Sequence, residues 1–84
     1  MLVSGRVQAV GFRWHCRNQA VERGLAGFVR NLSDGQVEAV FEGIPEDVEA
    51  MVDWCRTGPS MAEVDSIDVR EETPAGEEQF RIVR

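Results

Sequence analysis

Residues 3–13 read VSGRVQAVGFR, and they outline a strand, a loop of small residues and the start of a helix. We expect the strand over residues 2–7 and the helix over residues 12–23, where Gly24 provides a natural stop. Such a loop aims several backbone N–H groups at one point, and a helix N-terminus adds partial positive charge. Arg13, in the first helical turn, can present a bidentate guanidinium to the same anion. The stretch therefore predicts an anion site, although loop glycines also serve simply as turn formers.

The rest of the chain predicts one more helix and four more strands. Strands are expected over residues 27–32 and 37–42, joined by the turn signal Ser33-Asp34-Gly35. A helix with an apolar stripe follows, starting near Pro45 and ending near residues 57–59. The last strands are expected over residues 64–71 and 79–83. This order predicts a ferredoxin-like βαββαβ α+β sandwich in one domain, residues 1–84, with an antiparallel sheet, both helices on one face and a short extra C-terminal strand.

Composition excludes several classes of protein. The net charge of −6 argues against a generic nucleic-acid binder, and no apolar run approaches the roughly 20 residues of a membrane span. Two cysteines and one histidine cannot build a tetrahedral zinc site without heavy carboxylate help. All nine basic residues are arginines, so lysine Schiff-base and P-loop lysine chemistry are absent. Five of these arginines precede Leu32, against one acid, which gives an otherwise acidic protein a cationic first third.

The motifs together make the chain recognisable. VSGRVQAVGFR, followed by GFVRN, SDG and the closing FRIVR, resembles the acylphosphatase family over essentially the whole chain. The resemblance implies a metal-free enzyme without cofactors that hydrolyses the carboxyl–phosphate bond of acyl phosphates. The N-terminal domain of a hydrogenase-maturation carbamoyl transferase is similar, but this chain ends where the acylphosphatase domain does.

The resemblance also implies roles for individual residues. Arg13 would hold the phosphoryl group, and Asn31 would orient the attacking water. The phosphate-binding loop would comprise Arg6, Val7, Gln8, Ala9, Val10, Gly11 and Phe12, together with Arg13. The family usually has glycine in place of Ala9, and alanine would be strained by about 1 kcal/mol or more if φ must be positive there. That departure leaves open a non-catalytic domain that only binds phosphate or a protein partner.

The residue types are consistent with the implied substrate. An acyl phosphate releases a carboxylate, whose conjugate acid has a pKa of about 4–5, so no general acid is required. The reaction needs a stabilised phosphoryl group and an in-line water. Arg13 and the backbone amides supply the first, and the Asn31 carbonyl can supply the second. Read without the motif, Arg13 would be a solvent-facing helix residue and Asn31 a turn residue.

Other residues receive simpler interpretations. His15 lies about 200° around the helix from the target of Arg13, and we expect it to be a surface or partly packed residue. Cys16 and Cys55 fall on apolar faces and are expected to be free core thiols, although a disulfide between them is geometrically conceivable. Five aromatic residues are expected to serve in packing rather than to stack on bases: Trp14, Phe28, Phe41, Trp54 and Phe80. We expect a cytoplasmic monomer that binds acyl phosphates, inorganic phosphate or other anions, and neither nucleic acid nor a membrane.

Overall fold

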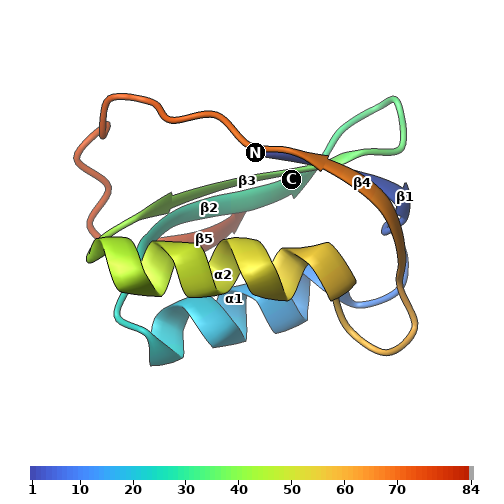
Figure 1. Cartoon of the computed structure of the whole chain (residues 1–84), viewed down its shortest axis with the longest axis horizontal. Coiled ribbons are helices and arrows are strands. Elements are labelled where there is room, and N and C mark those ends of the chain that lie inside the picture. The colour runs from blue at the N-terminus through green and yellow to red at the C-terminus, as the bar shows by residue number, and fades with distance from the viewer. Residues whose placement is uncertain (84) are drawn as a thin grey trace.

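Two helices and five strands form two layers in the computed structural model, which describes residues 1–83 (Figure 1). Both helices lie on the same face of the sheet. No helix within these residues has the length and apolar character needed to cross a membrane. In chain order the elements are β1 (Leu2–Arg6), α1 (Phe12–Glu22), β2 (Ala26–Asn31), β3 (Val37–Glu42), α2 (Pro45–Thr57), β4 (Glu63–Asp68) and β5 (Phe80–Val83).

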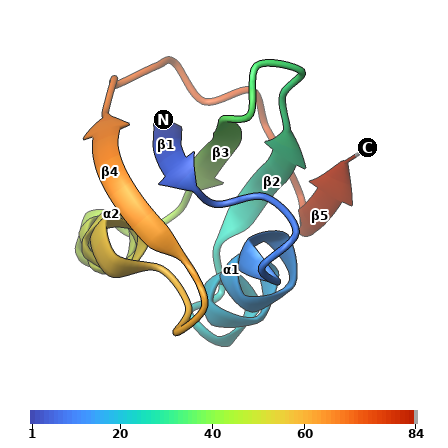
Figure 2. The same cartoon turned by 90° about the vertical axis from the view of Figure 1, so that its right-hand side faces the viewer.

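The sheet has the strand order β4-β1-β3-β2-β5, which Figure 2 shows from one end. The ferredoxin-like prediction is confirmed, including the short extra strand, but the sheet is mixed rather than antiparallel. The first four strands pair antiparallel, whereas β5 pairs parallel to β2. The reason is the route of the chain: β4 runs antiparallel to β1 and towards the end of the sheet where β2 begins. After crossing to the opposite edge, the chain turns back and runs beside β2 in the same direction.

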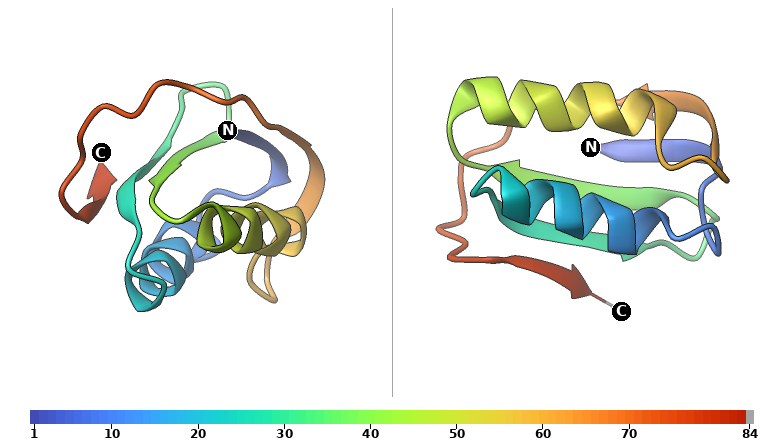
Figure 3. Two further views of the ribbon diagram at one scale, coloured as in Figure 1. Left: turned by 60° about the vertical axis from the view of Figure 1, so that its left-hand side comes forward. Right: turned by 90° about the horizontal axis from the view of Figure 1, so that it is seen from below.

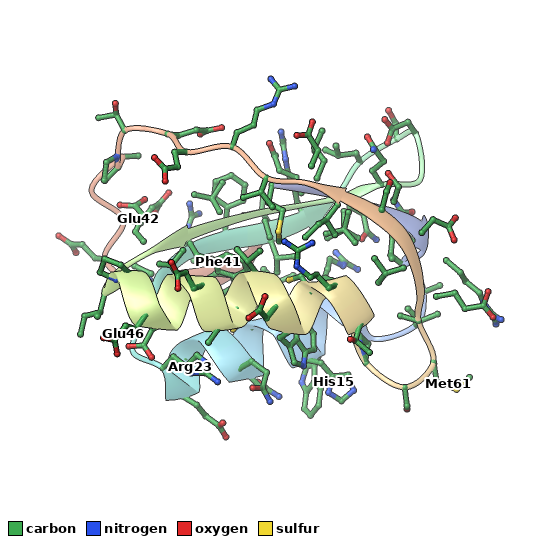
Figure 4. The ribbon with its side chains drawn as sticks, viewed as in Figure 1. His15, Arg23, Phe41, Glu42, Glu46 and Met61 are labelled. Atoms are coloured by element: carbon green, nitrogen blue, oxygen red, sulfur yellow. The ribbon has the colours of Figure 1, made fainter. Side chains whose placement is uncertain are left out.

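A long connection, residues 69–79, joins β4 to β5 and passes over the face of the sheet that the helices leave open (Figure 1). The strand predicted over residues 64–71 was too long, because β4 ends at Asp68. Asp68 pairs with Leu2, the first residue of β1, so β1 has no further residue with which β4 could pair. Glu42, labelled at the end of β3 in Figure 4, holds this connection. Its Oε1 accepts hydrogen bonds from the backbone N–H groups of Gly76 and Glu77, at 3.2 and 3.3 Å.

The helices run antiparallel beneath the sheet and enclose the hydrophobic core (Figure 3). An ion pair between Arg23, at the end of α1, and Asp47, in the first turn of α2, joins them at 3.5 Å. Burying these apolar side chains is the main stabilising contribution to the fold. The buried residues are Val3, Val7, Phe12, Cys16, Ala20, Leu25, Val29, Val37, Ala39, Met51, Cys55 and Phe80.

Cys16 and Cys55 are both buried as free thiols, as expected for core cysteines. The two side chains contact each other where the start of α1 meets the end of α2. The hydrogen bond with Cys55 and burial raise the pKa of the Cys16 thiol far above its ordinary value. A thiol in this state stays protonated, so Cys16 cannot act as a nucleophile at neutral pH.

Candidate functional site

The loop between β1 and α1 contains two residues with a positive φ. Ala9 has a φ of 60°, and Gly11, at the N-cap of α1, has φ 77° and ψ 14°. Within the described part of the chain, no side chain caps this end of the helix. The first backbone N–H groups of α1 are therefore left without intrahelical partners and available to a ligand. An uncapped helix N-terminus joined to a left-handed loop is well suited to bind an anion.

Gln8 fastens this loop to the hairpin between β2 and β3. Its Nε2 donates to the backbone oxygens of Leu32 at 2.7 Å and Gln36 at 2.9 Å. These two carbonyls flank the hairpin turn, which directly follows Asn31 at the end of β2. The side chain of Gln8 thus fixes the distance between the loop and Asn31.

The loop, the start of α1, the end of β2 and β5 line a pocket of about 160 Å³. Arg13 and Asn31 both line it, although they are far apart in the sequence and come from different elements. Its lining residues are Val7, Ala9, Gly11, Phe12, Arg13, Trp14, Asn31 and Ile82. None of them is a carboxylate, a histidine or a cysteine, so Arg13 carries the only charge that residues 1–83 contribute to the lining.

Asn31 and Arg13 both have unused hydrogen-bonding capacity. The Oδ1 atom of Asn31 is buried and has no hydrogen-bond partner among residues 1–83. A buried oxygen without a partner costs about 1–3 kcal/mol, so such atoms tend to be retained where they bind a water or a ligand. No carboxylate within those residues pairs with the Arg13 guanidinium, whereas Arg30 on the open face forms an ion pair with Glu38. The pocket therefore offers a free cation and a free acceptor to whatever enters it.

The residues expected to form the site fall into two groups. Arg13, Asn31, Val7, Ala9, Gly11 and Phe12 line the pocket. Three others do not line it: Arg6 is exposed at the end of β1, Gln8 turns its side chain towards the hairpin, and Val10 packs against the core.

Two residues that the sequence analysis did not assign to the site also line the pocket, Trp14 and Ile82. Trp14 is 59% exposed, and its ring packs edge to face against the ring of His15. A sequence signal did exist: Trp14 lies off the stripe of Phe12, Cys16 and Ala20 that faces the core. Nothing local marks Ile82, because its position depends on where β5 joins the sheet. His15 is exposed, as predicted, and does not line the pocket.

We expect Ala9→Gly to raise the free energy of unfolding by about 0.5–1 kcal/mol. Relief of left-handed strain contributes about 1–2 kcal/mol, and the greater entropy of an unfolded glycine offsets about half of it. Chemical denaturation measures the difference. Ala75→Gly is the matched control, because Ala75 is exposed and does not have a positive φ. Equal or lower stability of the Ala9 variant would show that alanine fits this conformation without strain.

Comparison with known proteins places this geometry in a family. The family model described as acylphosphatase matches residues 1–82. A curated acylphosphatase from Roseiflexus sp. (strain RS-1) is 57% identical over 84 residues, which cover 99% of this chain and 90% of the relative. The crystal structure of acylphosphatase from Bacillus subtilis superposes with a TM-score of 0.93 at 37% identity, covering 99% of this chain and 93% of that one.

A larger protein contains a similar unit. Full-length HypF, solved in its phosphate- and nucleotide-bound form, matches with a TM-score of 0.89 at 35% identity, but the match covers only 11% of that chain. The similarity to the curated relatives and to the Bacillus subtilis enzyme instead extends over nearly the whole of both proteins. The chain therefore belongs to the acylphosphatase family.

Proposed function

We propose that the protein hydrolyses the carboxyl–phosphate bond of acyl phosphates in the pocket between Arg13 and Asn31. One observation supports these roles. Asn31, whose buried Oδ1 has no hydrogen-bond partner among residues 1–83, lines the same small pocket as Arg13, which pairs with no carboxylate of those residues. The guanidinium of Arg13 and the free N–H groups at the start of α1 bind the phosphoryl oxygens. The Asn31 oxygen accepts a hydrogen bond from a water and holds it for attack.

The reaction requires positioning and charge stabilisation rather than acid catalysis. The oxygen of the held water forms a bond to phosphorus while the bond from phosphorus to the carboxylate oxygen breaks. The electron pair of that bond leaves with the carboxylate, and a phosphoryl oxygen accepts a proton from the water. Charge on the equatorial oxygens is stabilised by Arg13 and the backbone amides throughout. A carboxylate leaves without protonation, which suits a pocket to whose lining residues 1–83 contribute no acid.

The same lining supports a mechanism that needs no metal ion. Metal ions that assist phosphoryl transfer are bound by carboxylates, and histidine and cysteine are the other common protein ligands. Within the described part of the chain, the pocket lining offers none of these side chains. Inorganic phosphate, the product, presents the same oxygens as the substrate and is proposed to bind competitively.

Other features bear on the compartment, the partners and the oligomeric state of the protein. We place the protein in the cytoplasm, because two free thiols are typical of a reducing compartment. Acidic side chains on the open sheet face, Glu38 and Glu42, oppose contact with nucleic acid. We propose that the protein acts as a monomer, since a single chain already brings Arg13 and Asn31 together in one pocket.

Hydrolysis of acetyl phosphate in the presence of excess EDTA tests the proposal. We expect turnover of the wild-type protein to be the same with EDTA as with added Mg²⁺. Competitive inhibition by inorganic phosphate is expected in both conditions. Turnover that EDTA abolishes and Mg²⁺ restores would contradict the metal-free mechanism. A folded protein that binds phosphate without turnover would instead be a binding domain.

Replacing Gln8 tests whether the loop must be held against the hairpin. Gln8→Ala removes two hydrogen bonds to backbone oxygens, at a cost of about 1–2 kcal/mol in the free energy of unfolding. We expect kcat/KM to fall about tenfold as well, because a displaced loop misaligns the phosphoryl group relative to the water. Gln19→Ala, on α1 and outside the pocket, is the matched control. Loss of stability with unchanged kcat/KM would assign Gln8 a purely structural role.

A further inference from the structure

The second half of β3 has a free edge on the side of β1. β1 pairs with β3 at Leu2 and Val3, and Met1 exchanges two backbone hydrogen bonds with Ala39, each of 3.0 Å. Alternate residues of a strand direct their backbone groups to the same side, so the N–H and C=O of Phe41 face the same edge as those of Ala39. Neither group has a backbone partner on that side among residues 1–83. Phe41 can therefore pair with a further strand.

The segment that follows β4 is unpaired at the same level of the sheet. The sequence pattern predicts a strand over residues 64–71, whereas β4 ends at Asp68, opposite Leu2. None of residues 69–75 forms a backbone hydrogen bond with another backbone group of residues 1–83. In the sheet, β1 lies between β3 and β4. The line of β1 thus continues between two backbone segments that both have free hydrogen-bonding groups.

This continuation of the β1 line is a groove of about 730 Å³, which we call the β3 groove. It is lined by β3, by α2 and by the connection that follows β4, and Figure 1 shows α2 and the connection on either side of β3. Its apolar side is formed by Phe41, labelled in Figure 4, together with Val48 and Val52 of α2. The β3 groove shares no lining residue with the pocket of Arg13 and Asn31.

The β3 groove is strongly acidic. Seven glutamate and aspartate side chains line it, against two arginines and the amine of Met1. Both arginines already form ion pairs with aspartates, whereas Glu71 and Glu72 form none within residues 1–83. The Oε2 atom of Glu42 is buried and has no hydrogen-bond partner among those residues. The charge of the β3 groove therefore favours a cationic ligand.

We propose that the β3 groove binds an extended segment of a partner protein, in which basic and apolar residues alternate, as an added strand that continues β1. Such a strand runs antiparallel to β3, as β1 does. Its residue opposite Phe41 shares a face with Phe41 and is apolar, because it packs against α2. The residues on either side of it point to the other face, where basic side chains meet Glu42 and the connection that carries Glu71 and Glu72. Main-chain hydrogen bonds then give affinity, and the alternating side chains give specificity.

A second copy of the chain suits this groove less well. Two copies with a net charge of −6 repel each other and present the same acidic groove. The groove also lies between two segments of one chain, so it admits a single extended strand rather than the edge of another sheet. A short basic segment of a different protein meets both conditions.

The test titrates the protein with the acetylated and amidated peptide RVRVR and follows the backbone amides by NMR and hydrogen exchange. We expect the largest shifts at residues 40–42 and 69–72, and protection of the Phe41 amide from exchange. The same peptide with both valines N-methylated keeps the charges but loses donors to β3, so we expect about tenfold weaker binding. The peptide EVEVE keeps the backbone and reverses the charge, and it should not bind.

A matched pair of double variants tests the acidic side of the β3 groove. Glu71→Gln/Glu72→Gln is expected to weaken binding of RVRVR by about three- to tenfold, since two ion pairs are lost. Glu22→Gln/Glu63→Gln removes the same charge from two exposed residues outside the groove and should leave the affinity unchanged. None of the four forms an ion pair within residues 1–83, and the NMR spectra show whether each variant is folded.

The possible results support or overturn the proposal as follows. Shifts confined to the β3 groove, lost on N-methylation and weakened only by the Glu71 and Glu72 changes, would establish strand addition. Equal binding of the N-methylated peptide, or equal weakening by both double variants, would show unspecific attraction of cations and overturn it. No binding of RVRVR at millimolar concentration would overturn it too. A stable dimer in sedimentation, with the Phe41 amide already protected, would identify a second copy as the occupant instead.

Discussion

Arg13→Ala is expected to lower kcat/KM for acetyl phosphate by about 10²–10³, equivalent to about 3–4 kcal/mol of transition-state stabilisation. The variant removes the only charge that the described residues place in the pocket lining, at the point where negative charge collects on the phosphoryl oxygens. The backbone N–H groups at the start of α1 remain, so residual activity above the uncatalysed rate should survive. Affinity for inorganic phosphate should fall too, because the same guanidinium binds the ground state. Steady-state kinetics with and without phosphate measure both effects.

Two further variants test whether the loss of activity is specific to the Arg13 guanidinium. Arg17→Ala removes an exposed arginine one turn along the same helix, outside the pocket, and is expected to keep wild-type kinetics. Arg13→Lys retains the charge without the planar fork and should recover only part of the lost activity. Full turnover in Arg13→Ala would remove this residue from the mechanism.

Asn31→Ala is expected to lower kcat by about 10²-fold while the inhibition constant of inorganic phosphate changes little. An interaction made with the attacking water acts on the chemical step and only weakly on binding of the anion, so kcat and kcat/KM should fall together. Loss of the buried amide also removes an unpartnered oxygen, so the variant should be no less stable than wild type. The two measurements together distinguish a residue that positions water from one that holds the fold.

Asn18→Ala is the matched control, since Asn18 lies on α1, and its side chain bonds only to Arg17 among the described residues. A rise in KM at constant kcat for Asn31→Ala would show instead that Asn31 binds the substrate uniformly.

Local chemistry explains how much of this site could be predicted. Residues 3–13 predict a strand, an anion-binding loop and the start of a helix. Each of these signals depends only on a few neighbouring residues, and the position of Arg13 in the first helical turn is equally local. The role of Asn31 came from the family resemblance, because an asparagine before a turn signal has an ordinary explanation. Only the fold shows that its Oδ1 is buried beside Arg13 without a partner.

What the sequence did not reveal depends on contacts between distant segments. The bonds from Gln8 to the hairpin join residues that no periodicity connects. The parallel pairing of β5, and with it the place of Ile82, follows from the path of residues 69–79 across the sheet. The end of β4 at Asp68 depends on where its partner strand begins. In each case the structure depends on a residue that is distant in the sequence, and the local sequence pattern does not indicate which residue that is.

The route of the chain through the sheet also bears on how fast the protein folds. β1 lies between β3 and β4, and β5 returns to the far edge beside β2, so most strand pairs join segments separated by a helix or by the long connection. Such pairings bring together segments that are far apart in the sequence, so the chain loses entropy before the favourable contacts form. The protein is therefore expected to fold much more slowly than a helical bundle of its size. Stopped-flow refolding should show a single slow phase in which recovery of catalytic activity coincides with formation of the β2–β5 edge.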